Sequence, residues 1–147
     1  MKFQVWNTTK GQMKRFEVFH QRRLRKILRI RWSHFVTNDE VLNRARIKNI
    51  NTLISAARLR WLGHVVRMPE DRVPHYLLDW KPTHGKRSRG RPRTNWRSCV
   101  LEDAASFIGR TNITMEEVKQ QAMNRIHWRS LIRQKKEFLC GAGNSND

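Results

Sequence analysis

The chain has 147 residues, which is enough for one ordinary domain with a modest hydrophobic core. Its 31 Lys and Arg outnumber 12 Asp and Glu, and the net charge of +19 opposes compaction unless a polyanion neutralises it. Nucleic acid is therefore the first partner to consider, and an anionic membrane surface is the second. Because 38% of the residues are hydrophobic, we expect a folded helical body with disorder only at its ends.

The cysteines and the absence of long apolar runs indicate the compartment. Cys99 and Cys140 lie far apart without metal-binding spacing, which argues against a disulfide framework or a zinc knuckle and fits a reducing environment. The first residues lack the apolar run of a signal peptide, and no stretch approaches the roughly 18 apolar residues of a membrane span. The sequence therefore predicts a soluble, intracellular protein.

The first strong helical periodicity covers residues 9–31. Side chains recur at steps of three and four, which predicts one buried stripe: Met13, Phe16, His20, Leu24, Ile27 and Leu28. The opposite side carries a basic ridge: Arg22, Arg25, Lys26 and Arg29. Residues 14–31 hold eight basic residues and one acid, whereas a merely solvated face usually mixes both signs. The ridge is therefore a candidate phosphate-binding surface, and a solvated helix face remains the alternative.

Two further helices are predicted before residue 70. Thr37 and Glu40 have the spacing of a capping box, which begins a short helix that ends near Arg46. Residues 51–68 have the clearest helical pattern, and Pro69 ends it. One face of this helix is predicted to be buried: Ile54, Ala57, Trp61, Leu62 and Val65.

A short helix is predicted over residues 75–80, with Pro74 in its first turn. Residues 81–93 show no periodicity, because prolines and glycines interrupt any regular element. We expect an exposed basic loop there. Its candidate nucleic-acid-binding residues are Lys86, Arg87, Arg89, Gly90, Arg91, Pro92 and Arg93.

Three helices are predicted after this loop. Their capping residues are Thr94 or Asn95 and Gly109 for the first, Thr114 with Glu117 for the second, and Asn124 for the third. The residues expected to face inward are Trp96, Val100, Ala104, Phe107, Val118, Ala122, Trp128, Leu131 and Ile132.

These patterns together predict a mainly α fold, a small bundle of about six or seven short helices with an exposed basic Gly/Pro loop in the middle. An N-terminal helical half covers residues 1–80 and a basic linker loop covers 81–93. A C-terminal helical half follows over 94–139, and residues 140–147 form a flexible tail.

No catalytic centre is predicted. The acids occur mostly as doublets such as Glu102–Asp103, and two of the doublets lie in helix first turns, where capping explains them. The six histidines show no metal-ligand spacing. Cys99 has no paired base in a recognisable pattern, so a buried core thiol is expected. The sequence therefore predicts no catalytic residue, metal, cofactor or small-molecule substrate.

Four segments together carry a resemblance: LRKILRIRWSHFVTNDEVL, RLRWLGHVVRM, GKRSRGRPRTNWRSCVLEDA and NRIHWRSLI. They are similar to the carboxy-terminal segment of LINE-type (non-LTR) retrotransposon reverse transcriptases, over residues 6–133. In that family an endonuclease domain and a polymerase domain with a catalytic aspartate pair precede this segment. The present chain has no adjacent aspartates and no room for either domain. The resemblance therefore implies a truncated copy of the region past the polymerase, without catalytic motifs, that binds RNA or DNA in the nucleus.

The basic loop carries a second, shorter resemblance. Residues Arg89 to Pro92 resemble the core of an AT-hook, in which arginines project along the narrow minor groove of A·T-rich DNA. Ser88 stands where that motif often has proline or arginine. A flexible linker that touches phosphates without preference, or a loop with no nucleic-acid role, remains the alternative.

Three other functions remain open at this stage. A fragment of this family can keep a role in RNA-directed DNA synthesis, although the aspartate pair is missing. The basic helix at residues 14–31 can instead bind a membrane or calmodulin. The reading frame can also lack a selected function. Oligomeric state and the choice between RNA and DNA are not predicted.

Overall fold

The computed structural model describes residues 8–80 and 95–138, with side chains up to residue 134. This part of the chain consists of seven α-helices and one short 3-10 helix and contains no strand, which confirms the mainly α prediction. The predicted loop at 81–93 and the predicted tail at 140–147 lie outside the described residues.

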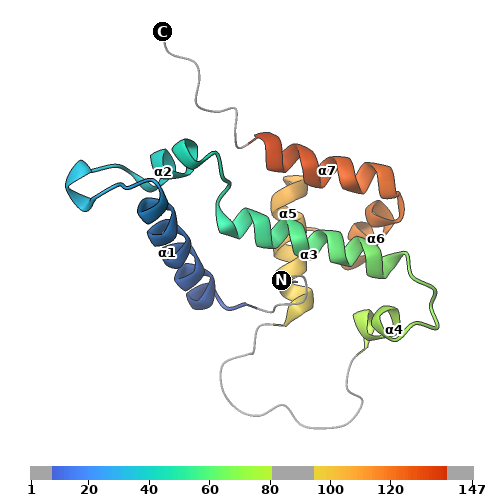
Figure 1. Ribbon diagram of the computed structural model, residues 1–147. Helices are drawn as coiled ribbons and strands as arrows, with labels where there is room; N and C mark the ends of the chain where they lie inside the picture. The colour runs from blue at the N-terminus through green and yellow to red at the C-terminus, as the bar shows by residue number, and fades with distance from the viewer. Residues whose placement is uncertain (1–7, 81–94, 139–147) are drawn as a thin grey trace, which may run out of the picture.

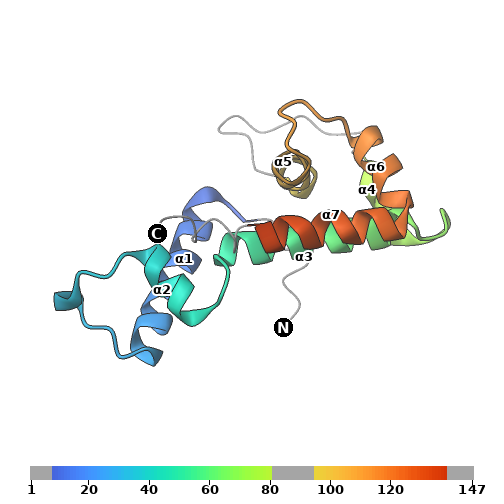
Figure 2. The same ribbon diagram turned by 90° about the horizontal axis from the view of Figure 1, so that it is seen from above.

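The long helix α3 (Ile50–Val66) lies at the centre of the fold. Helix α7 (Arg125–Phe138) runs antiparallel beside it, and α5 (Trp96–Ile108) crosses the pair at a steep angle (Figures 1 and 2). The shorter helices α4 (Val73–Asp79) and α6 (Met115–Met123) pack near the C-terminal end of α3. We call residues 49–80 and 95–138 the α3–α7 core.

Two helices project from this core as a separate lobe (Figure 1). Helix α1 (Lys10–Ile27) packs against α2 (Asn38–Ala45) and against α3. The connection between α1 and α2 contains the 3-10 helix η2 (Trp32–His34) and forms the outermost tip of the lobe. We call residues 8–48 the α1–α2 lobe.

Helix α3 is buried on more than the one face that its sequence predicts. Of the predicted face, Ile54, Leu62 and Val65 are buried, but Ala57 and Trp61 are partly exposed. Residues outside that face are fully buried instead, among them Leu59. The reason is that α1, α4, α5, α6 and α7 all contact α3, so a single apolar stripe does not describe it.

The main hydrophobic cluster joins the two helical halves predicted on either side of residues 81–93. It includes Ala56, Leu59, Leu62, Val65, Val66, Leu78, Val100, Ala104, Phe107, Met115, Val118, Ala122, Trp128 and Ile132. Because these residues come from α3 and α4 as well as from α5, α6 and α7, both halves share one core. The C-terminal helices are therefore expected to fold with α3 rather than alone.

The predicted helix caps of the C-terminal half are confirmed. Asn95 Oδ1 accepts the Ser98 backbone N–H at 2.7 Å, and Gly109 ends α5 in the left-handed conformation, at φ +80°. Thr114 and Glu117 form the reciprocal capping box. These signals are local in the chain, which is why the sequence alone predicts them well.

The N-terminal caps differ in detail from the prediction. Thr37 Oγ1 accepts the Glu40 N–H at 3.3 Å, but the Glu40 carboxylate pairs with Arg44 at 2.8 Å, so half of the expected capping box forms. Helix α1 ends at Ile27 rather than near residue 31, and Arg29 has a left-handed φ of +54°. Ile27, predicted to be buried, is 74% exposed, because the chain leaves the helix there.

Candidate nucleic-acid interface

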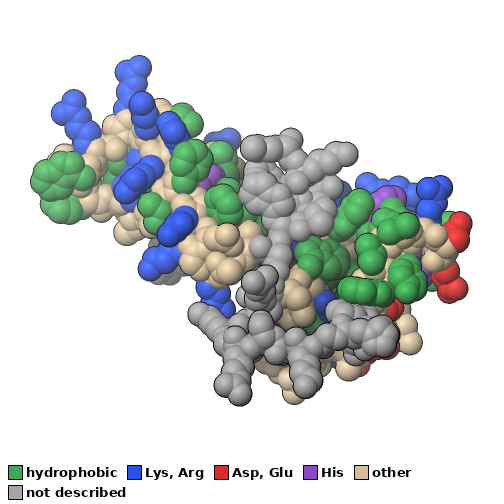
Figure 3. Space-filling model, turned by 90° about the horizontal axis from the view of Figure 1, so that it is seen from below, with side chains coloured by type: hydrophobic (Ala, Val, Ile, Leu, Met, Phe, Trp, Pro, Cys, Tyr) green, Lys and Arg blue, Asp and Glu red, His purple; other side chains and the backbone are tan. Residues whose placement is uncertain are grey.

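The α1–α2 lobe and the α3–α7 core differ sharply in charge balance. Each contains twelve Lys and Arg, but the lobe has three Asp and Glu where the core has eight. The net charge is therefore +9 over the 41 residues of the lobe and +4 over the larger core. Lys and Arg side chains gather over the lobe, and Asp and Glu lie at the opposite end (Figure 3).

The exposed basic side chains of α1 have no carboxylate partners among the described residues. Six of its basic residues are exposed: Lys10, Lys14, Arg15, Arg22, Arg23 and Lys26. The one acid of the helix, Glu17, accepts a hydrogen bond from Asn49 Nδ2 at 3.2 Å. It is therefore engaged at the start of α3, and the exposed surface of α1 has charge of one sign.

One strip of α1 combines cations with an exposed aromatic ring. A shallow hollow on this helix is lined by Lys14, Arg15, Val18, Phe19 and Arg22, with Gly11 at one end. Phe19 is 56% exposed, and the Arg23 guanidinium lies over its ring at 5.0 Å from the centroid. A basic strip with an exposed ring can hold a phosphate backbone and also contact a base.

Not all four residues of the predicted basic ridge are exposed and free of other contacts. Arg22 and Lys26 are exposed on α1, as expected. Arg25 instead donates from Nη2 to the Val36 carbonyl oxygen at 2.8 Å and to Asn38 Oδ1 at 2.9 Å. Its guanidinium therefore holds the connection to α2 in place. Arg29 is exposed but lies past the end of the helix.

The continuous basic face begins earlier than predicted. Arg15, Arg22 and Lys26 are seven and four residues apart, which places them on one side of the helix. Lys14 lies next to this row and lines the hollow on α1. The seven-residue spacing between Arg15 and Arg22 is visible in the sequence and could have placed both on one face. Nothing in the sequence indicates that Arg25 bonds to the connection between α1 and α2.

The other predicted binding residues lie outside the described residues. They are Lys86, Arg87, Arg89, Gly90, Arg91, Pro92 and Arg93. Their role stays a prediction.

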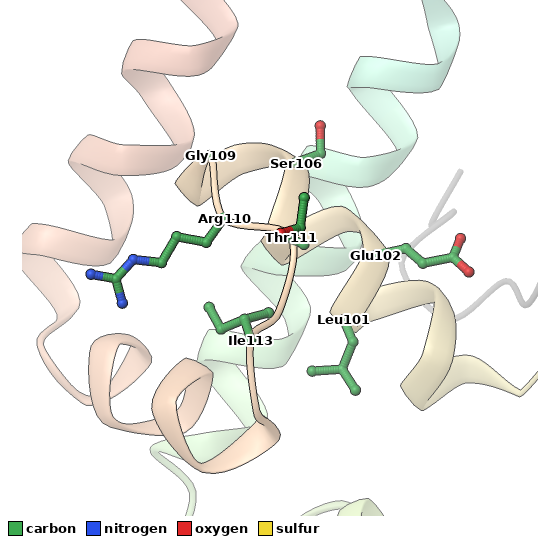
Figure 4. Close-up of a pocket in the computed structure, with 8 residues that line it drawn as sticks. Leu101, Glu102, Ser106, Gly109, Arg110, Thr111 and Ile113 are labelled. Atoms are coloured by element: carbon green, nitrogen blue, oxygen red, sulfur yellow. The ribbon is translucent and has the colours of Figure 1, made fainter.

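A hollow in the core brings no acid–base pair together. It lies between α5 and the turn that leads to α6, and its lining is mostly apolar (Figure 4). The side chains of Glu102 and Arg110 point in opposite directions at its rim. No group of three or more His, Cys, Asp or Glu that could hold a metal ion occurs in the described ranges.

A buried ion pair joins α3 to α5, and it was missed in the sequence. Arg58, which is 4% exposed, places Nε 2.8 Å from Asp103 Oδ2, and its Nη2 donates to Asp103 Oδ1 at 3.2 Å. Ser55 Oγ donates to the same Oδ1 at 2.6 Å. Burial raises the pKa of Asp103, and the contacts with Ser55 and Arg58 oppose that rise. The Asp103 carboxylate is therefore committed to holding two helices together.

Cys99 lies next to this pair in the core. It is 5% exposed, and burial raises the pKa of its thiol. The prediction of a buried core thiol is confirmed. A thiol with a raised pKa is a poor nucleophile near neutral pH.

A close contact between α3 and α7 joins residues from two of the four sequence segments that carry the resemblance. The Trp128 indole Nε1 donates to the Leu59 carbonyl oxygen at 2.9 Å. A Cβ atom on Gly63 would lie 2.4 Å from that nitrogen, so only glycine fits there without displacing the ring. Arg67 extends the contact by donating to the Ala122 carbonyl oxygen. These residues therefore act in packing.

Comparisons with protein-family models, with curated proteins and with solved structures find no match for this chain. The resemblance to LINE-type reverse transcriptases therefore rests on the four sequence segments alone. Across the described residues, no helix is long and apolar enough to cross a membrane.

Proposed function

We propose that this chain is a non-catalytic nucleic-acid-binding module and that the α1–α2 lobe carries its phosphate-contacting surface. The observation that carries this proposal is the set of exposed Lys and Arg on α1 without carboxylate partners among the described residues. Cations left unpaired on a folded surface repel one another, and a polyanion relieves that repulsion.

The length of the basic face suits a phosphate backbone. From Arg15 to Lys26 the face extends about 16 Å along the helix axis. Duplex DNA carries one charge for about every 1.7 Å of its axis, so several phosphates lie within reach of the three or four cations of this face. Single-stranded RNA or DNA offers the same phosphates with greater freedom to follow the surface.

The origin and the cellular setting belong to the same proposal. The four segments suggest descent from the region past the polymerase of a LINE-type reverse transcriptase, where such a module would hold template RNA or target DNA in the nucleus. The basic loop with its AT-hook-like core, Arg89 to Pro92, would add a second contact. A role in RNA-directed DNA synthesis is then an accessory one, because the chain has no adjacent aspartates.

A salt-resolved binding titration tests the proposal. The test variant replaces Lys14, Arg15, Arg22 and Lys26 by Gln, and the control variant replaces Arg72, Arg110, Arg125 and Arg129, which are exposed in the core. Both variants lose the same charge. We expect the α1 variant to flatten the slope of log K against log salt on duplex DNA, by about 0.9 for each phosphate that is no longer neutralised. Equal effects in the two variants would mean that net charge alone drives binding.

The same titration separates the possible partners. Matched RNA, single-stranded DNA, and A·T-rich and G·C-rich duplexes are compared, with anionic vesicles and calcium-loaded calmodulin as further arms. If the loop reads the minor groove, replacing Arg89 and Arg91 by Gln erases a preference for A·T-rich duplex. Wild-type binding to vesicles or calmodulin, with none to any nucleic acid, would overturn the proposal.

A further inference from the structure

The tip of the α1–α2 lobe exposes two aromatic rings that pack on nothing in the core. Trp32 is 86% exposed and Phe35 is 85% exposed. Their centroids are 6.5 Å apart with the rings at 79°, an edge-to-face pair. In Figure 3 hydrophobic side chains cover this end of the molecule, and Lys and Arg side chains project beside them. Large exposed rings are costly in water, so their position calls for an explanation.

The connection that carries the rings is held by hydrogen bonds. Arg25 donates hydrogen bonds to the Val36 carbonyl oxygen and to Asn38 Oδ1, at the end of the connection that leads into α2. The Phe35 N–H donates to the Trp32 carbonyl oxygen at 3.2 Å and closes the 3-10 turn. The rings are therefore presented on an ordered turn, which lowers the entropy that binding would cost.

The backbone at this turn is strained at the aromatic residue itself. Phe35 has a φ of +49°, a left-handed conformation that a bulky side chain rarely adopts and that glycine would adopt without cost. Glycine at this position would ease the turn and remove the exposed ring. Strain of this kind is frequent at binding sites, where the surrounding structure maintains it.

The chain segment that carries the rings is basic, and the acids Asp39 and Glu40 follow it at the start of α2. Residues 18–38 contain six Lys and Arg and no Asp or Glu. Arg29 and Arg31 lie just before Trp32 in the chain and are exposed. A ligand for this tip should therefore combine flat apolar faces with closely spaced negative charges.

We propose that Trp32 and Phe35 form a stacking platform for unpaired bases of single-stranded RNA or DNA, with Arg29 and Arg31 on the adjoining phosphates. This inference rests on the proposed nucleic-acid-binding function and specifies its ligand. Base faces are open to stacking in a single strand, whereas in a duplex they are covered by neighbouring base pairs.

A lipid surface fits the tip less well. Burial of the two rings in a bilayer would carry the exposed Ser33, His34 and Arg31 into the interface with them. Of the aliphatic residues near the rings in the chain, Ile27 is 74% exposed, whereas Ile30 and Val36 are partly buried. An oligonucleotide accepts the same arginines as phosphate contacts, so the mixed composition of the tip favours it.

The test compares aromatic and aliphatic replacements at the tip. Trp32→Leu keeps an apolar side chain but removes the large ring, and Trp32→Phe keeps a ring. The control is Trp80→Leu in the core, which removes a 52% exposed tryptophan from another surface. The probes are a uridine 20-mer, a thymidine 20-mer, a blunt duplex of the same length, and vesicles of phosphatidylserine and phosphatidylcholine.

We expect Trp32→Leu and Phe35→Ala each to weaken binding to single strands by roughly 5- to 150-fold at constant salt, the range for one stacked base. Trp32→Phe should retain most of the affinity, and Trp80→Leu should match the wild type. The slope of log K against log salt should not change, because no charge is removed. Quenching of tryptophan fluorescence by the uridine 20-mer should be smaller in Trp32→Phe than in the wild type.

Three results would overturn the inference, and they are distinguishable. Wild-type affinity of Trp32→Leu for single strands would reject stacking while leaving the lobe a phosphate-binding surface. If Trp32→Leu weakens binding to the duplex and to single strands equally, the ring inserts between base pairs of duplex DNA instead. If Trp32→Leu loses binding to vesicles of phosphatidylserine and phosphatidylcholine while its binding to oligonucleotides is unchanged, the tip is a membrane contact. If the wild-type protein binds none of the oligonucleotides, the proposed function itself is wrong.

Discussion

The α1–α2 lobe and the α3–α7 core contain equal numbers of basic residues but use them in different ways. In the core, Arg58 pairs with Asp103, Arg97 with Asp79 and Glu116, and Lys119 with Asp79. On α1 the exposed cations have no such partners among the described residues. Part of the core's charge is therefore committed to ion pairs between helices, as Arg58 and Asp103 show, whereas the exposed charge of α1 is not.

One tryptophan from each region, and the residues with a left-handed backbone, show a further contrast. The core buries Trp128 to 1% exposure, while the lobe leaves Trp32 at 86%. Where the core needs a left-handed residue it uses Gly109, whereas the lobe places Arg29, Phe35 and Arg46 in that conformation. The lobe thus departs from the rules of stable packing in its charge, in its exposed rings and in its backbone conformation.

The largest expected effect comes from comparing Trp128 in the core with Trp32 in the lobe. Trp128→Ala should lower the free energy of unfolding by about 3–5 kcal/mol, because a buried ring and its hydrogen bond to Leu59 are removed. Trp32→Ala should change it by at most about 0.5 kcal/mol, because the ring is exposed. Urea unfolding of both variants measures the difference. A destabilisation by Trp32→Ala as large as that of Trp128→Ala would show that the lobe tip is structural.

The two classes of arginine provide the next test. Arg58→Met leaves the buried Asp103 without its cation, and we expect a loss of about 3–5 kcal/mol at neutral pH. Since burial already raises the pKa of Asp103, the carboxyl can take up a proton, and the deficit should shrink as the pH falls. Replacing Asp103 by Leu in the same chain should restore part of the stability. Arg22→Met in the lobe should have little effect on unfolding.

Sequence reasoning succeeded where the signal was local and was incomplete where partners were distant in the chain. Caps at Asn95, Gly109 and Thr114 depend on neighbours within four residues. Arg58 and Asp103 are 45 residues apart, so helical spacing cannot pair them. The same limit explains Arg25, whose position on the helix was predicted but whose bonds to the far end of the connection were not.

Two helical glycines should respond in opposite ways to the same change. Gly63→Ala would place a Cβ 2.4 Å from the Trp128 indole nitrogen, and we expect a loss of about 1–3 kcal/mol. Gly11→Ala has nothing within 4 Å of the new atom, and a gain of about 0.4–1 kcal/mol is expected from reduced freedom of the unfolded chain. Thermal and urea unfolding measure both. A gain at Gly63 would show that α3 and α7 pack less closely than described.

The smallest expected effect concerns the acid dependence of a surface pair in the core. The hydrogen bond from Lys119 lowers the pKa of Asp79, with smaller contributions from the charges of Lys119 and Arg97. A carboxyl with a lowered pKa in the folded state stabilises the protein above its unfolded pKa of about 4, and this stabilisation is lost as the pH falls through the folded value.

Asp79→Asn should therefore lower the unfolding midpoint slightly at pH 7 and flatten its fall below about pH 4. Lys119→Met should flatten the fall of the unfolding midpoint in the same way, because the main cause of the lowered Asp79 pKa is removed. Asp71→Asn, at an exposed acid without an ion pair in the described ranges, controls for the loss of one negative charge. The Asp79 side chain is 52% exposed, so 1 M salt should reduce the effect further. An acid dependence identical in all three variants would mean that the surface pairs of the core contribute as little to folding as the free cations of α1.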